Sequence, residues 1–189
     1  MLVGLVGLKG NGKSEVAKFL ERALGFRRTR FADTLKEMLA VLLAAQGLSD
    51  EDIERMIDGD LKEEPSSYLG NKTPTYAMQT LGTEWGRDLI DYDMWLNITM
   101  NQITRTINDG HSVVVDDVRF KNEYDLVRGL GGYIINIVGR SAVVQDHVSE
   151  KFSWLDHVDA TISNTGTLDQ LFTMAEGTIN AIRKELWAP

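Results

Sequence analysis

The feature that most restricts how this chain can fold is a glycine-rich octet near its amino end, GLKGNGKS, at residues 7–14. An apolar run typical of a buried strand leads into it, and residues 14–24, with apolar side chains at helical spacing, follow it. Between a strand and a helix, such a loop turns its backbone N–H groups toward phosphate oxygens, with the positive end of the helix dipole behind them. The sequence therefore predicts a phosphate-binding loop in a βαβ unit. A plain connecting turn is the alternative, which the flanking strand and helix disfavour.

Each residue type in the octet suits phosphate chemistry. Glycine lets the backbone approach a phosphate closely, the Lys13 ammonium reaches the outer phosphates, and the Ser14 hydroxyl is a ligand for Mg²⁺. We therefore expect ATP as the bound nucleotide and Mg²⁺ as the cofactor. The ATP contacts expected in this loop are Lys9, Gly10, Asn11, Gly12, Lys13 and Ser14.

Short aliphatic runs alternate with helical patterns along the rest of the chain. Nearly continuous aliphatic strands are typical of parallel sheets buried on both faces. The alternation predicts an α/β chain with the three-layer P-loop NTPase fold, a mainly parallel five-stranded sheet and a single domain over residues 1–189. The expected strands are 2–8, 26–32, 112–116, 133–138 and 160–162, and the expected helices are 14–24, 93–108 and 167–186, the last with a capping box of Thr167 and Gln170.

Two stretches depart from this alternation. Residues 46–73 are polar and acidic and contain Pro65, which is typical of an inserted helical or loop segment. Residues 139–158 follow a strand and show no sustained period, which favours a flap.

A pair of carboxylates, Asp116 and Asp117, ends the aliphatic strand Val113 to Val115. In P-loop proteins a carboxylate at the end of a neighbouring strand orders magnesium. Either aspartate suits this role. We assign Asp116 to the metal and Asp117 to a substrate contact, and a solvated turn is the alternative, which the nearby Arg119 disfavours.

Composition limits the partners. The formal net charge of −8 disfavours binding to nucleic acid, because the field of the whole molecule repels a phosphate backbone. The longest apolar run, Met38 to Ala45, is far shorter than the ~18 residues of a membrane span, so no membrane partner is expected. Without a secretory signal pattern at the amino end, a cytoplasmic location is expected.

The loop alone does not select among P-loop functions. The Asn-Lys-x-Asp signature of guanine-binding proteins does not occur, and motors usually need a larger chain with sensor elements. A compact small-molecule kinase fits the length. Such an enzyme must cover both substrates, because water left in the site would accept the phosphoryl group.

Several segments resemble the bacteriophage deoxynucleoside monophosphate kinases, and they occur in that family's order over most of the chain. The QTLGTEWGR block is the most specific of them, whereas the phosphate-binding loop is shared with many other kinases. The matching segments are residues 7–14, 31–36 (FADTLK), 79–87 (QTLGTEWGR), 117–123 (DVRFKNE), 147–150 (HVSE) and 162–168 (ISNTGTL).

The resemblance implies transfer of the ATP γ-phosphoryl group to the 5′-phosphate of a deoxynucleotide (dNMP). It implies an acceptor-binding insertion over residues 46–90, a lid over 139–158, a homodimer and, for a phage protein, the host cytoplasm. The transition state spreads negative charge over the transferred group, so the site needs cations more than a base. The expected catalytic cations are Lys13, Arg119 and Arg140.

The remaining site residues also follow from the resemblance. Arg87 would clamp the acceptor phosphate, and Asn164 and Gly166 would shape the adenine pocket in the turn before the last helix. His147 matches the family pattern, but a lone histidine in a loop is more often a hydrogen-bonding or surface residue than a proton carrier. The expected dNMP contacts are Asp33, Lys36, Gln79, Thr83, Trp85, Arg87, Asp117 and Glu150.

Structural alternatives stand beside these roles. Arg87 could be a surface arginine paired along a helix, Asp33 a plain N-cap followed by an exposed Lys36, and Trp85 a core residue with Leu81. For the whole chain, the alternatives are a dephospho-coenzyme A kinase and an ATP-binding regulatory module without turnover. Assays with dephospho-coenzyme A and with an added monophosphate separate these two alternatives from a deoxynucleoside monophosphate kinase.

Overall fold

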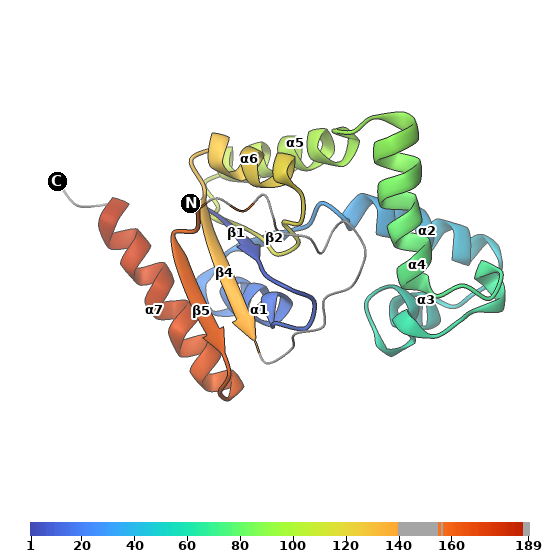
Figure 1. Cartoon of the computed structure of the whole chain (residues 1–189), viewed down its shortest axis with the longest axis horizontal. Coiled ribbons are helices and arrows are strands. Elements are labelled where there is room, and N and C mark those ends of the chain that lie inside the picture. The colour runs from blue at the N-terminus through green and yellow to red at the C-terminus, as the bar shows by residue number, and fades with distance from the viewer. Residues whose placement is uncertain (140–154, 156, 187–189) are drawn as a thin grey trace. The chain divides into compact units, whose positions relative to one another are not determined.

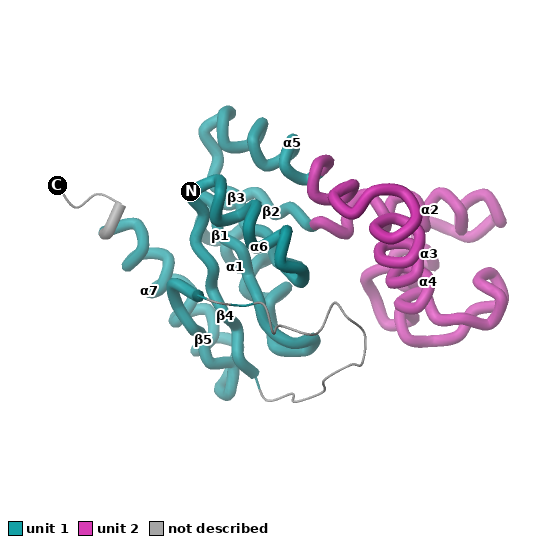
Figure 2. Tube along the Cα trace, turned by 45° about the horizontal axis from the view of Figure 1, so that its top comes forward, with its two compact units in different colours: residues 1–30, 99–189 teal, residues 31–98 magenta. Residues whose placement is uncertain are grey.

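The computed structural model of the chain describes residues 1–139, 155 and 157–186 (Figure 1). The chain forms two compact units (Figure 2). Unit 1 consists of residues 1–30 and 99–189, and unit 2 of residues 31–98. Helix α5, Met94–Asn108, contains the second boundary between them. No helix among the described residues has the length and apolar character needed to cross a membrane.

Unit 1 is built on a five-stranded sheet with the order β2-β3-β1-β4-β5. Every neighbouring pair is parallel, so the predicted sheet is confirmed and all carboxyl ends lie along one edge. The central strands β1 and β3 are buried throughout, as their aliphatic sequences predict. The strands are β1 Leu2–Val6, β2 Arg27–Thr29, β3 Val113–Val115, β4 Tyr133–Gly139 and β5 Ala160–Asn164.

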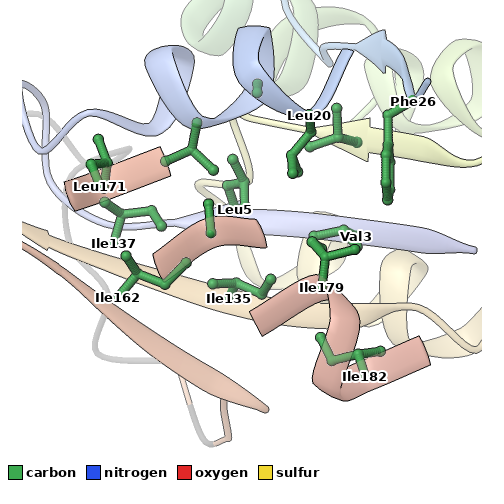
Figure 3. Close-up of a cluster of buried hydrophobic side chains, with 14 residues drawn as sticks. Val3, Leu5, Leu20, Phe26, Ile135, Ile137, Ile162, Leu171, Ile179 and Ile182 are labelled. Atoms are coloured by element: carbon green, nitrogen blue, oxygen red, sulfur yellow. The ribbon is translucent and has the colours of Figure 1, made fainter. Parts of the chain in front are cut away.

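Helices cover both faces of this sheet, which confirms the predicted three-layer α/β architecture (Figure 1). On one face, α1 (Lys13–Leu24) and α7 (Leu168–Leu186) bury a continuous apolar core against the strands (Figure 3). On the other face lie α5 and α6 (Lys121–Gly129). The core on the α1 side includes Val3, Leu5, Leu20, Phe26, Ile135, Ile137, Ile162, Leu171, Ile179 and Ile182.

Helix ends follow the sequence closely. The capping box before α7 is confirmed, because the Gln170 N–H donates to Thr167 Oγ1 at 3.3 Å and the Thr167 N–H donates to Gln170 Oε1 at 2.9 Å. Gly25 ends α1 in the left-handed conformation. Strand β2 is shorter than the predicted 26–32, because it lies at the edge of the described sheet and pairs there with β3 over three residues.

Unit 2 is helical and has its own core, centred on Leu39, Leu43, Met56 and Trp95. The predicted insertion at 46–90 falls inside it, and its acceptor-binding role stays a prediction. The elements of unit 2 are α2 Asp33–Ala45, α3 Asp50–Ile57, η1 Asp60–Glu63, η2 Ser67–Leu69, α4 Pro74–Thr80 and the π-helix η3 Leu81–Ile90.

The charged residues of unit 2 include Asp33 at the start of α2 and two ion pairs, Lys36–Asp58 and Arg55–Asp60. Asp33 is the first residue of α2 and not its N-cap, which is Ala32, so the expected cap is wrong by one position. Lys36 pairs with Asp58, and its side chain is largely buried, so the exposed-lysine alternative is also wrong. A side-chain hydrogen bond from Arg55 lowers the pKa of Asp60.

Two leucines on α7 test the packing of unit 1. Leu171 is fully buried and Leu168 is 53% exposed. Leu171→Ala is expected to lower the free energy of unfolding by about 2–5 kcal/mol, because it leaves a cavity in the sheet–helix core. Leu168→Ala should change it by less than about 0.5 kcal/mol. Urea unfolding followed by circular dichroism measures both, and equal losses would contradict this core assignment.

Candidate nucleotide-binding site

The glycine-rich loop leaves the carboxyl end of β1 and enters α1. Three of its glycines, Gly7, Gly10 and Gly12, have positive φ angles of 135°, 82° and 97°, which other residues rarely adopt. A Cβ on Gly7 would lie 2.3 Å from the Ile137 carbonyl oxygen. The loop therefore requires glycine for conformation and for close packing, and the predicted strand–loop–helix unit is present.

Lys13 begins α1 and folds back over this loop. Its ammonium donates to the Gly7 carbonyl at 2.5 Å and to the Leu8 carbonyl at 3.0 Å. Ser14 follows in the first helical turn and is exposed. The structure thus brings a cation, a hydroxyl and the amino end of α1 together, which is an anion-binding arrangement.

Two asparagines tie the loop to neighbouring strands. Asn11, only 4% exposed, donates from Nδ2 to the carbonyl of Ile137 on β4 at 2.9 Å. Asn164, at the end of β5, donates from Nδ2 to the Asn11 carbonyl at 3.0 Å. These bonds fix the loop against β4 and β5, a contact that sequence analysis did not foresee for Asn164. Gly166 lies in the exposed turn before α7.

Asp116 directly follows β3 at the same edge of the sheet, and its side chain is almost fully buried. Arg28, on the neighbouring strand β2, donates from Nη2 to Asp116 Oδ2 at 2.5 Å. Sequence analysis missed Arg28. The available signal was a charged residue inside a predicted strand, which in a buried sheet calls for a charged partner.

The turn from β3 to α6 carries Asp117 and Arg119. Asp117 is buried, and Arg119 is partly exposed. The buried carboxylate of Glu123 accepts from the backbone N–H of Arg119 at 2.7 Å and from that of Phe120 at 3.1 Å. Glu123 therefore fixes the backbone of Arg119, which is a role that the sequence did not reveal.

Arg87 lies in the π-helix η3 of unit 2 and is 6% exposed. Its Nη1 donates to the Tyr92 carbonyl at 3.2 Å, and its guanidinium lies 5.7 Å from the centre of the Tyr92 ring. The alternative of a surface arginine is therefore wrong. A buried guanidinium held by backbone and ring contacts is well oriented for an anion.

The same π-helix surrounds a tryptophan that the sequence patterns did not single out. The Trp95 indole donates to the Gly82 carbonyl at 2.8 Å, and a Cβ on Gly86 would lie 2.6 Å from the indole nitrogen. Trp85 is 37% exposed with its ring centre 6.4 Å from that of Trp95, so the core alternative for Trp85 is wrong. The two remaining predicted residues of this block, Gln79 in α4 and Thr83, are partly exposed.

Some predicted site residues lie outside the described residues. They are Arg140, His147 and Glu150, together with almost all of the predicted lid at 139–158. Within unit 1, the structure brings together the loop residues 9–14, Asn164 and the end of β3 at one edge of the sheet. The predicted residues of unit 2 are Asp33, Lys36, Gln79, Thr83, Trp85 and Arg87.

Comparison with known proteins adds to this geometry. The family model for deoxynucleotide monophosphate kinase matches residues 75–174, just over half of the chain. A protein assigned to the same kinase in Acanthamoeba polyphaga mimivirus is 32% identical over 190 residues, which cover 92% of this chain and 93% of its own length. This chain belongs to the deoxynucleotide monophosphate kinase family.

Further relatives agree with this membership. The deoxynucleotide monophosphate kinase of Enterobacteria phage T4 is 27% identical over 107 residues, which are 56% of this chain and 44% of that protein. Among solved structures, a dephospho-CoA kinase from Campylobacter jejuni superposes with a TM-score of 0.54 at 15% identity, covering 97% of this chain and 98% of that one. The structural likeness shows the fold, which is that of P-loop kinases.

A glycine next to the loop tests how closely it is packed. A Cβ on Gly139 would lie 2.9 Å from the Asn11 Cα, whereas one on Gly129 meets no described atom within 4 Å. Gly139→Ala should displace the loop and weaken equilibrium ATP binding about tenfold, since overpacking strain costs about 1–3 kcal/mol and about 1.4 kcal/mol is tenfold in affinity. Gly129→Ala should bind as the unsubstituted protein does. Titration with a fluorescent ATP analogue compares them, and unchanged affinity of Gly139→Ala would refute this packing argument.

Proposed function

We propose that this chain transfers the γ-phosphoryl group of ATP to the 5′-phosphate of a deoxynucleoside monophosphate, giving ADP and a deoxynucleoside diphosphate. The observation that carries the proposal is the glycine-rich loop, with Lys13 over it and Asn11 and Asn164 holding it, in a chain of the deoxynucleotide monophosphate kinase family. A backbone cradle of this kind binds a triphosphate, and family membership supplies the acceptor.

The chemistry places few demands on proton transfer. An oxygen of the acceptor phosphate forms a bond to the γ-phosphorus while the bond from that phosphorus to the bridging oxygen of ADP breaks. The attacking oxygen is already anionic at neutral pH, so no strong general base is needed. Negative charge on the transferred group is stabilised by cations, for which we assign Lys13, Arg119 and Arg140.

The residues present fit a magnesium ion. Asp116 Oδ1 is buried and has no hydrogen-bond partner among the described residues, and Ser14 presents an exposed hydroxyl at the start of α1. Asp116 and Ser14 would hold the ion, as a carboxylate and a hydroxyl commonly do beside substrate phosphates. A magnesium ion held there would neutralise negative charge on the phosphates.

All ATP contacts are assigned to unit 1, whereas most acceptor contacts are assigned to unit 2. ATP contacts lie in unit 1, in loop residues 9–14 and at Asn164 and Gly166. In the acceptor set, Arg87 clamps the phosphate with its preorganised guanidinium, and Trp85 presents a partly exposed ring on which a base stacks. The other acceptor contacts are Asp33, Lys36, Gln79, Thr83, Asp117 and Glu150.

The proposed partners are therefore two small molecules, ATP and a dNMP. The formal charge of −8 supports small substrates over nucleic acid, because only a locally cationic site attracts phosphate. We also propose that the protein works as a homodimer, as the resemblance of its sequence to the family implies. A location in the cytoplasm of a host cell is proposed because its relatives come from viruses.

A substrate panel tests this function. The protein is incubated with ATP, magnesium and each common deoxy- or ribonucleoside monophosphate, and ADP formation is followed. Multiple turnovers with at least one deoxynucleotide are expected. Turnover with dephospho-coenzyme A instead would favour the other kinase class, and ATP binding without turnover on any acceptor would favour a regulatory module.

The role of Lys13 gives a direct prediction. Lys13→Ala should lower kcat by about 100-fold or more, on the scale of losing one preorganised charge contact in the transition state. Lys18→Ala is the matched control, because Lys18 lies on the same helix and, among the described residues, its side chain pairs only with Glu15 at the surface. Circular dichroism checks that both variants fold. A folded Lys13→Ala enzyme with near-normal kcat would remove Lys13 from the catalytic set.

Arg87 gives a second prediction, on the acceptor side. Arg87→Ala should raise KM for the monophosphate far more than KM for ATP, because only the acceptor loses its clamp. Arg87→Lys keeps the charge without the planar guanidinium and should show a smaller rise in the same KM. Arg55→Ala, at a surface arginine of unit 2, is the control. Equal rises in both KM values would move Arg87 out of the acceptor site.

A further inference from the structure

Arg28 and Asp116 form a largely buried ion pair at the edge of the sheet where the glycine-rich loop lies. Side chains of Arg28 and Asp116 are 19% and 2% exposed, and they join the edge strand β2 to the residue that follows β3. Burying two charges costs several kcal/mol per ion before pairing, so this pair is poorly explained as a stabilising contact alone. An aliphatic pair at these positions would serve the sheet equally well.

The Arg28–Asp116 pair leaves two buried polar atoms without a hydrogen-bond partner among the described residues. Among the described residues, the buried side-chain polar atoms without a hydrogen-bond partner are Asn11 Oδ1, Arg28 Nε and Asp116 Oδ1. All three belong to unit 1, and two of them belong to this one pair. Since buried polar atoms in native proteins are nearly always paired, such atoms point to a bound ion, water or ligand.

The two oxygens of Asp116 therefore differ. Oδ2 accepts from Arg28, whereas Oδ1 has no partner among the residues that the structure describes. A carboxylate with one oxygen held by a guanidinium keeps a fixed orientation, because the planar guanidinium is itself rigid. Partners of this kind orient metal-binding carboxylates in many proteins, and their loss typically costs about 10–100-fold in metal affinity.

We propose that Arg28 is a positioning residue for the magnesium ion of the nucleotide site. It holds Asp116 by Oδ2 and leaves Oδ1 for the shell of the ion that accompanies ATP. The inference rests on the proposed function only in requiring magnesium–ATP binding. It deepens that function by naming a residue that acts through Asp116 and selects which carboxylate oxygen serves the metal.

An electrostatic role and an orienting role for Arg28 predict opposite changes in magnesium affinity when Arg28 is replaced. If Arg28 acted only as a nearby cation, its removal would strengthen magnesium binding, because one repulsive charge is gone. If Arg28 acts by orienting Asp116, its removal weakens magnesium binding despite that gain. The sign of the effect therefore decides between the two roles.

The experiment measures equilibrium binding rather than turnover. Affinity for a fluorescent ATP analogue is titrated with excess magnesium and with EDTA, and the ratio gives the magnesium-dependent gain. Arg28→Gln should lower this gain about tenfold, at the lower end of the range for such partners, and leave the affinity in EDTA nearly unchanged. Arg27→Gln is the matched control, because Arg27 is exposed on the same strand and its side chain has no hydrogen bond or ion pair with any other described residue.

A second variant covers the case in which Arg28→Gln does not fold, since it leaves a buried carboxylate unpaired. Arg28→Lys keeps the charge but replaces the planar guanidinium by a single ammonium, and it should also lower the magnesium-dependent gain. An unchanged or larger gain in a folded Arg28 variant, or an equal loss of affinity with and without magnesium, would overturn the inference.

The substrate panel separates this inference from the proposed function. If the unsubstituted protein phosphorylates deoxynucleotides and the Arg28 variants keep their full magnesium-dependent gain, the positioning role fails and the function stands. If no monophosphate is phosphorylated but the Arg28 variants lose the gain as expected, the function fails and the positioning role stands.

Discussion

The parallel pairing of β1 with β3 on one side and β4 on the other is the constraint on which unit 1 depends. Because all five strands point the same way, the residues that follow them meet at one edge of the sheet. The glycine-rich loop follows β1, Asp116 follows β3, and Asn164 ends β5. Asn11 and Asn164, for example, are 153 positions apart, and the order of the strands brings them together.

Close packing converts this proximity into a preorganised loop. Gly7 and Gly139 lie where any side chain would collide with the Ile137 carbonyl or with Asn11, so backbone lies directly against backbone. The side-chain amides of Asn11 and Asn164 then hold the loop by donating hydrogen bonds to the main-chain carbonyls of Ile137 and Asn11. The backbone of the proposed phosphate-binding loop is therefore fixed before a ligand arrives, which is the condition for electrostatic stabilisation without reorganisation.

Local patterns in the sequence predict the local structure well. The loop, the capping box of α7 and the parallel strands follow from spacing and from aliphatic composition. The sequence carried a signal that Arg28 needs a charged partner, but Asp116 could not be predicted as that partner, because the two residues are 88 positions apart and meet through the order of the strands. The packing of Trp95 was not predicted for a similar reason. Its contacts with Gly82 and Gly86 depend on a π-helix, which has no simple sequence period. The sequence thus predicts candidate residues for the chemistry, whereas the residues that hold them in place are found only from the structure.

The balance of charge at the loop follows from these contacts. At physiological ionic strength, exposed charges more than about 8 Å apart are largely screened, so the net charge of −8 has little effect at the loop itself. There, the Lys13 ammonium and the amino end of α1 supply the positive potential. Arg28 adds little to it, because Asp116 neutralises its charge within the same buried pair. Arg28 therefore orients the Asp116 carboxylate and adds little to the electrostatic potential at the loop. For this reason, an ion pair with Arg28 is compatible with a metal-binding role for Asp116.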